Sequence, residues 1–165
     1  MFRPSIALAT VLLLALSTLS ACGASEEETA STNLWAKINK DRYRTFSKAP
    51  EWPTRRTSDS SIHAGTAEIY ANRLFQEEYC KNDSLNSWPV GTLIVKEGFD
   101  GDTVKVIAAM SKTAEGVWDF AEWDNAGAPI DSGAKCLSCH KSGNDYVKGF
   151  RFPQDYPNKK SHCGG

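Results

Sequence analysis

Thr92-Leu93-Ile94-Val95-Lys96-Glu97, residues 92–97, is rich in β-branched and apolar residues and leads to the turn signal Phe99-Asp100-Gly101-Asp102. Residues 103–110 also favour an extended conformation, so the two runs predict an antiparallel hairpin with a short Asp-Gly connection. Residues 117–123 follow a further turn, and an extended conformation there would place Trp118 and Phe120 on the same face. The sequence therefore predicts a third antiparallel strand with one strongly aromatic side.

Helical periodicity precedes these strands. Leu34, Trp35 and Ile38 are spaced as on a short helix, and residues 64–79 place apolar side chains at three- and four-residue steps without a proline. Both segments are predicted to be helical. Residues 41–62 mix aromatic with polar side chains, which is typical of a loop packed onto a domain surface. Helices followed by strands indicate an α+β domain with an antiparallel β-sheet and flanking helices.

A compact motif, Cys136-Leu137-Ser138-Cys139-His140, follows the turn at residues 124–129. Its two thiols are spaced to add to the vinyl groups of one haem, and a histidine directly after the second cysteine can reach the iron. We therefore expect one covalent haem c held by Cys136 and Cys139, with His140 as the proximal iron ligand. The motif is expected on a short helix near the C-terminus, with the sheet packed against the haem.

Three alternative roles for this motif remain open. A thioredoxin-like redox pair would lie between a strand and a helix of a βαβ unit, whereas here the motif comes after the strands. Half of a zinc site would need a second Cys or His pair at ligand spacing, and the sequence contains no such pair. The third alternative is a chance occurrence without a chemical role.

The N-terminal residues predict export. Residues 1–21 combine a positive start, an apolar run and a small-residue cleavage site, as a signal peptide does. The string Leu19-Ser20-Ala21-Cys22 resembles a bacterial lipobox, which implies that Cys22 is lipidated and becomes the mature N-terminus; an ordinary cleaved signal is the alternative. We expect a lipid anchor in the bacterial cell envelope that faces the periplasm, where c-type haem is matured. In a Gram-negative organism, Gly23 would direct the protein to the outer membrane.

Composition limits the organisation of the chain and its partners. There are 20 acidic and 19 basic residues, a balance that gives no reason to expect nucleic acid as a partner. Residues 22–33 are small and acidic and predict a flexible tether. Residues 34–165 are long enough for one domain with a hydrophobic core.

The cysteine count predicts a disulfide. Of the five cysteines, Cys22 is expected to carry lipid, and Cys136 and Cys139 to carry haem. Cys80 and Cys163 remain, and two leftover thiols in an oxidising compartment usually pair. We expect them to join the C-terminal tail to the body of the domain, with two free thiols as the alternative.

Four motifs together resemble the cytochrome P-460 family: residues 88–97, Trp118-Asp119-Phe120, the Cys-x-x-Cys-His motif, and Asn144-Asp145-Tyr146-Val147. The likeness covers residues 60–150 of the expected haem domain, and its most specific part is the Pro-x-Gly strand that leads to a lysine. The resemblance implies an antiparallel sheet with flanking helices, a homodimer, and a five-coordinate haem iron with an open distal side. In the hydroxylamine-oxidising branch a lysine is cross-linked to the haem and a carboxylate relays protons, whereas the cytochrome c′-beta branch caps the distal face with aromatic residues.

Lys96 stands at the position of the family's lysine, which makes it a candidate for a haem cross-link or a pocket residue. An exposed strand lysine is the alternative. Residues 104–110 contain no acid where the oxidising branch is expected to place its carboxylate, so the sequence favours a haem without a cross-link and argues against hydroxylamine oxidation. Glu97, Glu115 and Glu122 lie elsewhere in the sequence, and only the fold could bring one of them near Lys96. The candidate sixth ligands of the iron are His63, His162, Met110 and Lys96.

Three functions are compatible with these observations. The first is a haem protein that binds a small ligand such as nitric oxide, or performs redox chemistry on a small nitrogen compound such as hydroxylamine. The second is an electron-transfer cytochrome c with a six-coordinate iron and a partner cytochrome. The third is a structural lipoprotein whose motif holds no haem.

Overall fold

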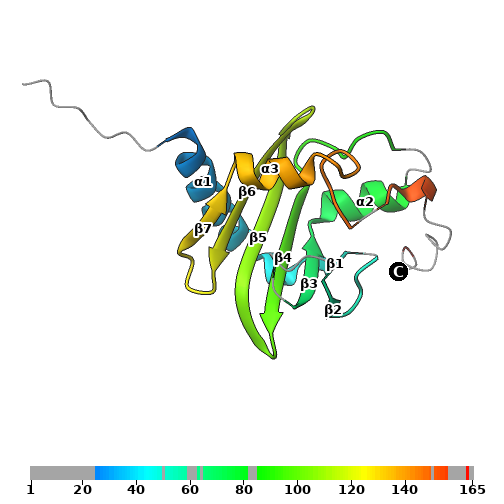
Figure 1. The fold of residues 1–165 in the computed structure, drawn as a ribbon. Helices are drawn as coiled ribbons and strands as arrows, with labels where there is room; N and C mark the ends of the chain where they lie inside the picture. The colour runs from blue at the N-terminus through cyan, green and yellow to red at the C-terminus, as the bar shows by residue number, and fades with distance from the viewer. Residues whose placement is uncertain are drawn as a thin grey trace, which may run out of the picture.

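The computed structural model describes residues 25–49, 51–58, 63, 65–81, 85–149, 151–155 and 163. These residues form an α+β fold in which three α-helices pack on a seven-stranded antiparallel sheet (Figure 1). The sheet order is β1-β3-β4-β5-β6-β7, and β2 also pairs with β3. The strands are β1 (Ser47–Lys48), β2 (Arg56–Thr57), β3 (Thr66–Ala71), β4 (Leu93–Asp100), β5 (Thr103–Ala114), β6 (Val117–Asp124) and β7 (Pro129–Ser132). The helices are α1 (Glu26–Lys40), α2 (Arg73–Lys81) and α3 (Ala134–His140), with 3-10 turns η1 (Tyr43–Thr45) and η3 (Pro153–Asp155).

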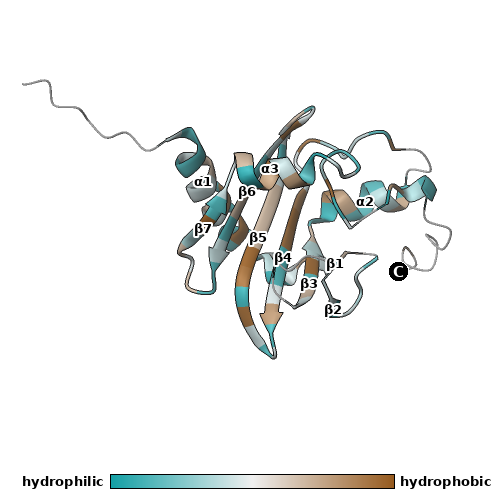
Figure 2. Cartoon of the chain, viewed as in Figure 1, coloured by the Kyte–Doolittle hydropathy of each residue, from teal (hydrophilic) through white to brown (hydrophobic). Residues whose placement is uncertain are grey.

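The predicted hairpin and third strand are confirmed as β4, β5 and β6, which form a continuous antiparallel meander. Each strand buries side chains on both of its faces, so the sheet separates two hydrophobic cores. Figure 2 shows apolar segments along β4 and β5 between the covering elements. One core contains Trp118 and Phe120 together with residues of α2, and the other contains Trp123 together with residues of α1. The predicted aromatic face of β6 therefore packs inside the first core.

The predicted helix over residues 64–79 is wrong in its first half. Residues 66–71 form the central strand β3, and only Arg73–Lys81 is helical. Ala67 and Ile69 lie on the same face of β3, opposite Gly98 and Lys96 of β4. A short run of apolar residues fits both the helical period of about 3.6 residues and the strand period of two, and here the pairing with β4 decides in favour of a strand. Asn72 ends the strand and begins the helix, because its Oδ1 accepts from the backbone N–H groups of Phe75 and Leu93.

Helix α1 begins at Glu26, not near residue 34, so residues 26–33 of the expected tether are helical. The Ser25 hydroxyl accepts a hydrogen bond from the Glu28 N–H at 3.2 Å and caps the helix. Three glutamates occupy the first turn, where their charge complements the helix dipole. Glu27 also accepts from the N–H of Ala134 at 3.1 Å, which fastens this end of α1 to the start of α3.

Other features agree with the sequence or add to it. Tyr43 and Trp52 are buried, as expected of the aromatic loop over residues 41–62, but the turn η1 and the two-residue strands β1 and β2 interrupt that loop. Helix α3 is the short helix expected to carry the Cys-x-x-Cys-His motif. The four-residue strand β7 was not predicted, because it is short and begins with a proline. The signal peptide, Cys22 and His162 lie outside the described residues. Within the part of the chain that the structure describes, no helix is long and apolar enough to cross a membrane.

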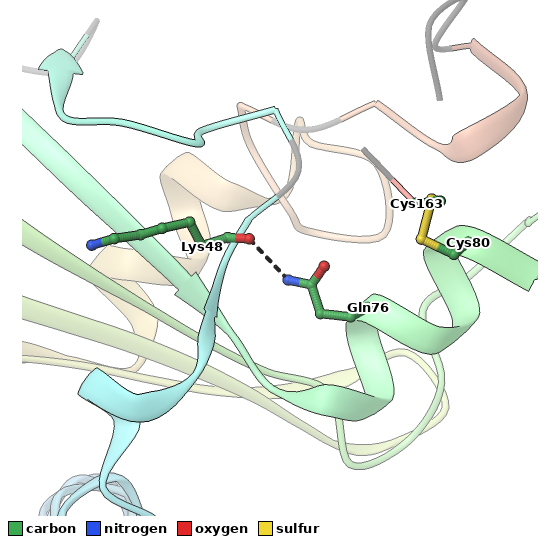
Figure 3. The surroundings of a disulfide bond; sticks show 4 residues. All are labelled: Lys48, Gln76, Cys80 and Cys163. Carbon is green, nitrogen blue, oxygen red and sulfur yellow. Dashed lines mark hydrogen bonds between the residues drawn. A yellow bond between two sulfur atoms is a disulfide. The ribbon is translucent and has the colours of Figure 1, made fainter. Parts of the chain in front are cut away.

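Cys80 and Cys163 form the disulfide expected from the cysteine count, with a Cα–Cα distance of 5.5 Å (Figure 3). The bond joins α2 to the C-terminal tail across a sequence separation of 83 residues. Helix α2 is also held from its other side, where Gln76 donates to the backbone oxygen of Lys48 at 3.1 Å. The disulfide therefore closes a long loop onto a helix that is already fixed to the sheet.

Replacing Cys80 and Cys163 together with alanine should lower the free energy of unfolding by about 2–4 kcal/mol, because the unfolded chain loses a long-loop constraint. Denaturant titration of the variant and the parent protein measures this difference. The pairing itself is checked by mass spectrometry, since intact protein should gain two alkyl groups only after reduction. Alkylation of either cysteine without reduction would contradict the pairing.

Candidate functional site

The Cys-x-x-Cys-His motif opens onto a cavity of about 240 Å³ between α3 and the face of the sheet that carries Phe120. Cys136, Cys139 and His140 all line it. Most of the remaining wall is apolar and comes from the sheet and the segment after α3: Ile69, Ile94, Ala108, Met110, Phe120 and Val147. The volume is close to the lower end of the range for ligand pockets, about 300–1,000 Å³.

Two ionisable side chains of the cavity lie in one row across the sheet. Lys96 of β4 pairs with Ala108 of β5, which pairs with Glu122 of β6. Directly opposed residues of an antiparallel sheet point to the same face, so Lys96 and Glu122 flank the small Ala108, and all three line the cavity. The fold therefore brings a carboxylate from outside residues 104–110, that of Glu122, into the same cavity as Lys96.

The acid lies one strand further from Lys96 than expected. Residues 104–110 belong to β5, the strand next to Lys96, whereas Glu122 belongs to β6, and it is buried, with 6% of its surface exposed. The sequence could have indicated this position, because Glu122 follows Trp118 and Phe120 at two-residue steps and so falls on the strand face already predicted to be aromatic. Glu97 faces the other core, and Glu115 is exposed, so Glu122 is the one of these three glutamates that reaches the cavity.

His140 is held in one orientation. Its Nδ1 lies 2.9 Å from the backbone oxygen of Tyr146, and its ring centre is 5.0 Å from that of Phe120. Burial, the largest cause, lowers the pKa of His140, which favours the neutral imidazole. With Nδ1 engaged by a carbonyl, the nitrogen left for a metal is Nε2.

The loop that presents the Tyr146 carbonyl is fixed by a buried ion pair. Lys112 has no exposed side-chain surface, and its Nζ lies 2.8 Å from Oδ2 of Asp145. Asp145 Oδ2 also accepts from the backbone N–H of Trp88 at 2.8 Å. Asp145 and Tyr146 both have positive φ angles, 49° and 66°, and a side chain on Gly143 would meet the Val147 oxygen at 2.4 Å. The ion pair therefore stabilises a tight turn next to the motif.

Lys112 was not singled out from the sequence. It follows Ala108 and Met110 at two-residue steps on β5, and those two residues line the cavity. A lysine in phase with buried residues indicates a buried partner, and this pattern was the available signal.

The two thiols of the motif have different surroundings. Cys136 is partly buried, and burial, with a smaller effect from Glu122, raises the pKa of its thiol to about 11. Cys139 is exposed, and Lys148 donates to its Sγ at 3.5 Å. A redox-active Cys-x-x-Cys pair depends on a lowered thiol pKa, so the raised pKa of Cys136 argues against a thioredoxin-like role. No group of three or more His, Cys, Asp or Glu side chains among the described residues is placed to hold a metal ion, as a zinc site would require.

Three of the four candidate sixth ligands, His63, Met110 and Lys96, line this cavity. His63 lies with Nδ1 2.6 Å from Oε1 of Glu122, close enough for an ion pair although the atoms are not aligned as a hydrogen bond. The ring centres of His63 and His140 are 6.5 Å apart, with the planes at 77°. Lys96 donates to the Ser58 hydroxyl at 2.7 Å.

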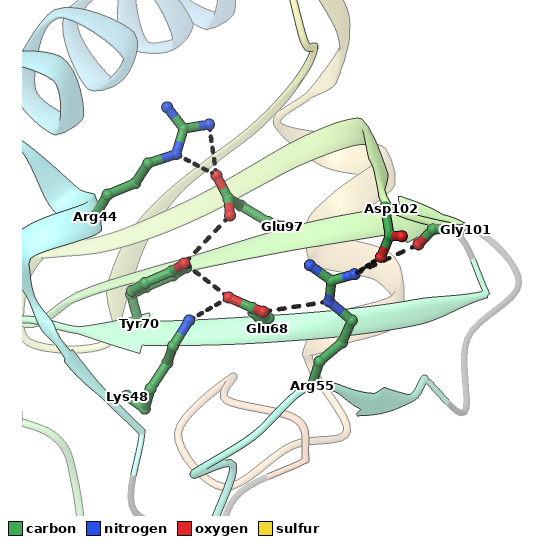
Figure 4. Close-up of polar contacts among 8 residues, drawn as sticks. All are labelled: Arg44, Lys48, Arg55, Glu68, Tyr70, Glu97, Gly101 and Asp102. Atoms are coloured by element: carbon green, nitrogen blue, oxygen red, sulfur yellow. Dashed lines mark hydrogen bonds and ion pairs between the residues drawn. The ribbon is translucent and has the colours of Figure 1, made fainter.

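The opposite face of the sheet carries a separate polar network around Glu97 (Figure 4). Buried Glu97 accepts from the Tyr43 hydroxyl at 2.6 Å and from Nε of Arg44 at 2.7 Å. Tyr70 donates to Glu97 and to Glu68. Burial raises the pKa of both phenols, with the hydrogen bonds to Glu97 and Glu68 adding to the effect, so both remain protonated donors. This network satisfies a buried carboxylate on the face that packs against α1 and does not reach the cavity.

The resemblance to the cytochrome P-460 family rests on the sequence motifs alone. Comparison of the chain with protein-family models and with curated proteins found no match.

Proposed function

We propose that this protein is a c-type haem protein of the cytochrome P-460 kind, anchored by lipid at Cys22 in the bacterial cell envelope and facing the periplasm. It would bind small ligands such as nitric oxide or carry out redox chemistry on small nitrogen compounds such as hydroxylamine. One observation carries the proposal. Cys136, Cys139 and His140 open together onto one largely apolar cavity, and His140 is held there through Nδ1.

The residues of the cavity suit a covalent haem. Cys136 and Cys139 would form the two thioethers, and His140 would bind the iron through Nε2. A bound haem supplies an iron that changes oxidation state and takes up small molecules. The apolar part of the wall would keep water away from a bound haem iron, which would favour small uncharged ligands over large or highly charged ones.

Lys96 and Glu122 favour a site that performs chemistry over a purely structural lipoprotein. Ionisable groups gathered around one cavity are typical of active sites. Glu122 presents a carboxylate on the cavity side of the sheet, with its Oε1 2.6 Å from Nδ1 of His63. An oxidoreductase of this kind would pass electrons to a partner cytochrome, and the family resemblance implies that it works as a homodimer.

The proposal is tested with full-length protein produced together with a haem-maturation system. Haem that stays with the polypeptide on a denaturing gel, and a haem band in the reduced-minus-oxidised spectrum, are the expected results. A colourless protein would overturn the proposal in favour of the structural lipoprotein.

Lys96 decides between the two branches of the family. Since Glu122 supplies the carboxylate that residues 104–110 lack, we expect a Lys96–haem bond and therefore an absorption band shifted to the red, because such a bond perturbs the macrocycle. Lys96→Ala should lose the red-shifted band and the lysine–haem adduct in a tryptic digest. Lys135→Ala is the matched control, because Lys135 also lines the cavity and its side chain is 81% exposed. An ordinary spectrum in the parent protein, unchanged in Lys96→Ala, would place the protein with the uncross-linked branch.

An electron-transfer cytochrome c is the second candidate. The observation that favours it is that His63 and Met110, both able to bind iron, line the same cavity as His140. Low-spin bands in both oxidation states that carbon monoxide does not move would support this function over ligand binding.

A further inference from the structure

We infer that His63 is the second axial ligand of the haem iron in the resting protein, on the side opposite His140. This inference rests on the proposed function, because it requires the haem. It adds a protein ligand on the distal side, where the family resemblance implies an open position. A small ligand would then have to displace His63 in order to reach the iron.

The separation of the two imidazole rings supports direct ligation. Imidazole nitrogens bind first-row metals at about 2.0 Å, so two imidazoles on opposite sides of one iron have ring centres roughly 6 Å apart. The observed separation is 6.5 Å. A water or diatomic molecule held between the iron and His63 would add roughly another 3 Å, a hydrogen-bond length. The two rings therefore already have the spacing of an axial pair.

On both rings Nδ1 faces a protein oxygen, which leaves Nε2 available to bind the iron. His140 Nδ1 contacts the Tyr146 oxygen at 2.9 Å, and His63 Nδ1 contacts Glu122 Oε1 at 2.6 Å. Metal-bound histidines usually engage their second nitrogen with a carbonyl or a carboxylate, which fixes the ring and raises its basicity. His140 has this support from the Tyr146 oxygen, and His63 has a carboxylate oxygen within ion-pair distance of its Nδ1; both histidines line the cavity.

Gly98 lets the backbone of His63 lie against the sheet. A Cβ at position 98 would be 2.1 Å from the His63 oxygen and 2.6 Å from Cγ1 of Val106. Gly98 has no positive φ that would require glycine, so close approach is the reason for a glycine within β4. Residues 96 and 98 point to the same face of the strand, which places His63 over the cavity side.

The other two candidates inside the cavity are less suited to the iron. Lys96 donates to the Ser58 hydroxyl. Met110 of β5 lies between its paired residues, Ile94 of β4 and Phe120 of β6. His63, by contrast, has a carboxylate oxygen of Glu122 2.6 Å from its Nδ1.

The test uses full-length holo-protein and its His63→Ala variant, both with covalent haem shown by gel staining. We expect a low-spin ferric spectrum by optical absorption and electron paramagnetic resonance in the parent protein, and a high-spin spectrum in the variant. Added imidazole should return the variant to low spin. If His63 occupies the iron for about nine-tenths of the time or more, its removal should raise the apparent affinity for carbon monoxide by about tenfold or more.

Further variants separate the outcomes. Met110→Leu should remain low-spin, and Gly98→Ala should gain high-spin character because it displaces His63. Gly65→Ala is the control for the loop, since a Cβ there meets its nearest atom at 3.9 Å. A parent protein that is high-spin, or a His63→Ala variant that stays low-spin, overturns the inference while leaving the haem in place. Absence of covalent haem overturns the proposed function instead.

Discussion

Replacing Cys136 and Cys139 together with alanine should abolish covalently bound haem. These are the two free cysteines of the described residues and both line the cavity, whereas Cys80 and Cys163 are joined to each other. No other pair in the site can form thioethers at this spacing. The expected result is complete loss of haem staining on a denaturing gel and a mass equal to that of the polypeptide alone.

Two controls make this result specific. The Cys80→Ala and Cys163→Ala double variant should keep its haem, because neither Cys80 nor Cys163 lines the cavity. Each single variant of the motif should retain haem through one thioether. Recovery of stained haem in the Cys136→Ala and Cys139→Ala double variant would show that the motif is not the attachment site.

Lys112→Met should lower the free energy of unfolding by about 3–5 kcal/mol, the cost of leaving one partner of a buried ion pair without its counter-charge. The side chain of Lys112 is fully buried, and that of Asp145 is 8% exposed. Denaturant titration measures the change. Lys37→Met is the matched control, because Lys37 pairs with Asp41 at 3.0 Å on the surface, with 46% of its side chain exposed. An exposed pair of this kind contributes less than about 1 kcal/mol.

The same variant tests the link between this ion pair and the motif. Asp145 precedes Tyr146, whose carbonyl orients His140, so loss of Lys112 should also disturb the haem spectrum while the protein is still folded. Lys37→Met should leave that spectrum unchanged. Equal stability of the two variants would show that Lys112 is not a stabilising partner of Asp145.

The sequence by itself determined the features that depend on local patterns. The β4–β5 hairpin and β6 were predictable because alternating residues and an Asp-Gly turn specify extended strands without any distant contact. The haem hypothesis follows from five consecutive residues, since the spacing of two thiols and a histidine is itself the chemical requirement. The pairing of Cys80 with Cys163 required only a count of cysteines and an oxidising compartment.

The tertiary structure decided the features that depend on which segments meet. The sequence of residues 66–71 alone fits a helix as well as a strand, and the hydrogen bonds to β4 make it a strand. Glu122, Lys96 and His63 are distant in sequence, and only strand register and the close approach of His63 to Gly98 bring them into one cavity. Register is a property of paired backbones, and a shift by one residue would turn Lys96 and Glu122 to the opposite face. For this reason the Cys-x-x-Cys-His motif could be recognised in the sequence, whereas the residues of the opposite cavity wall could not.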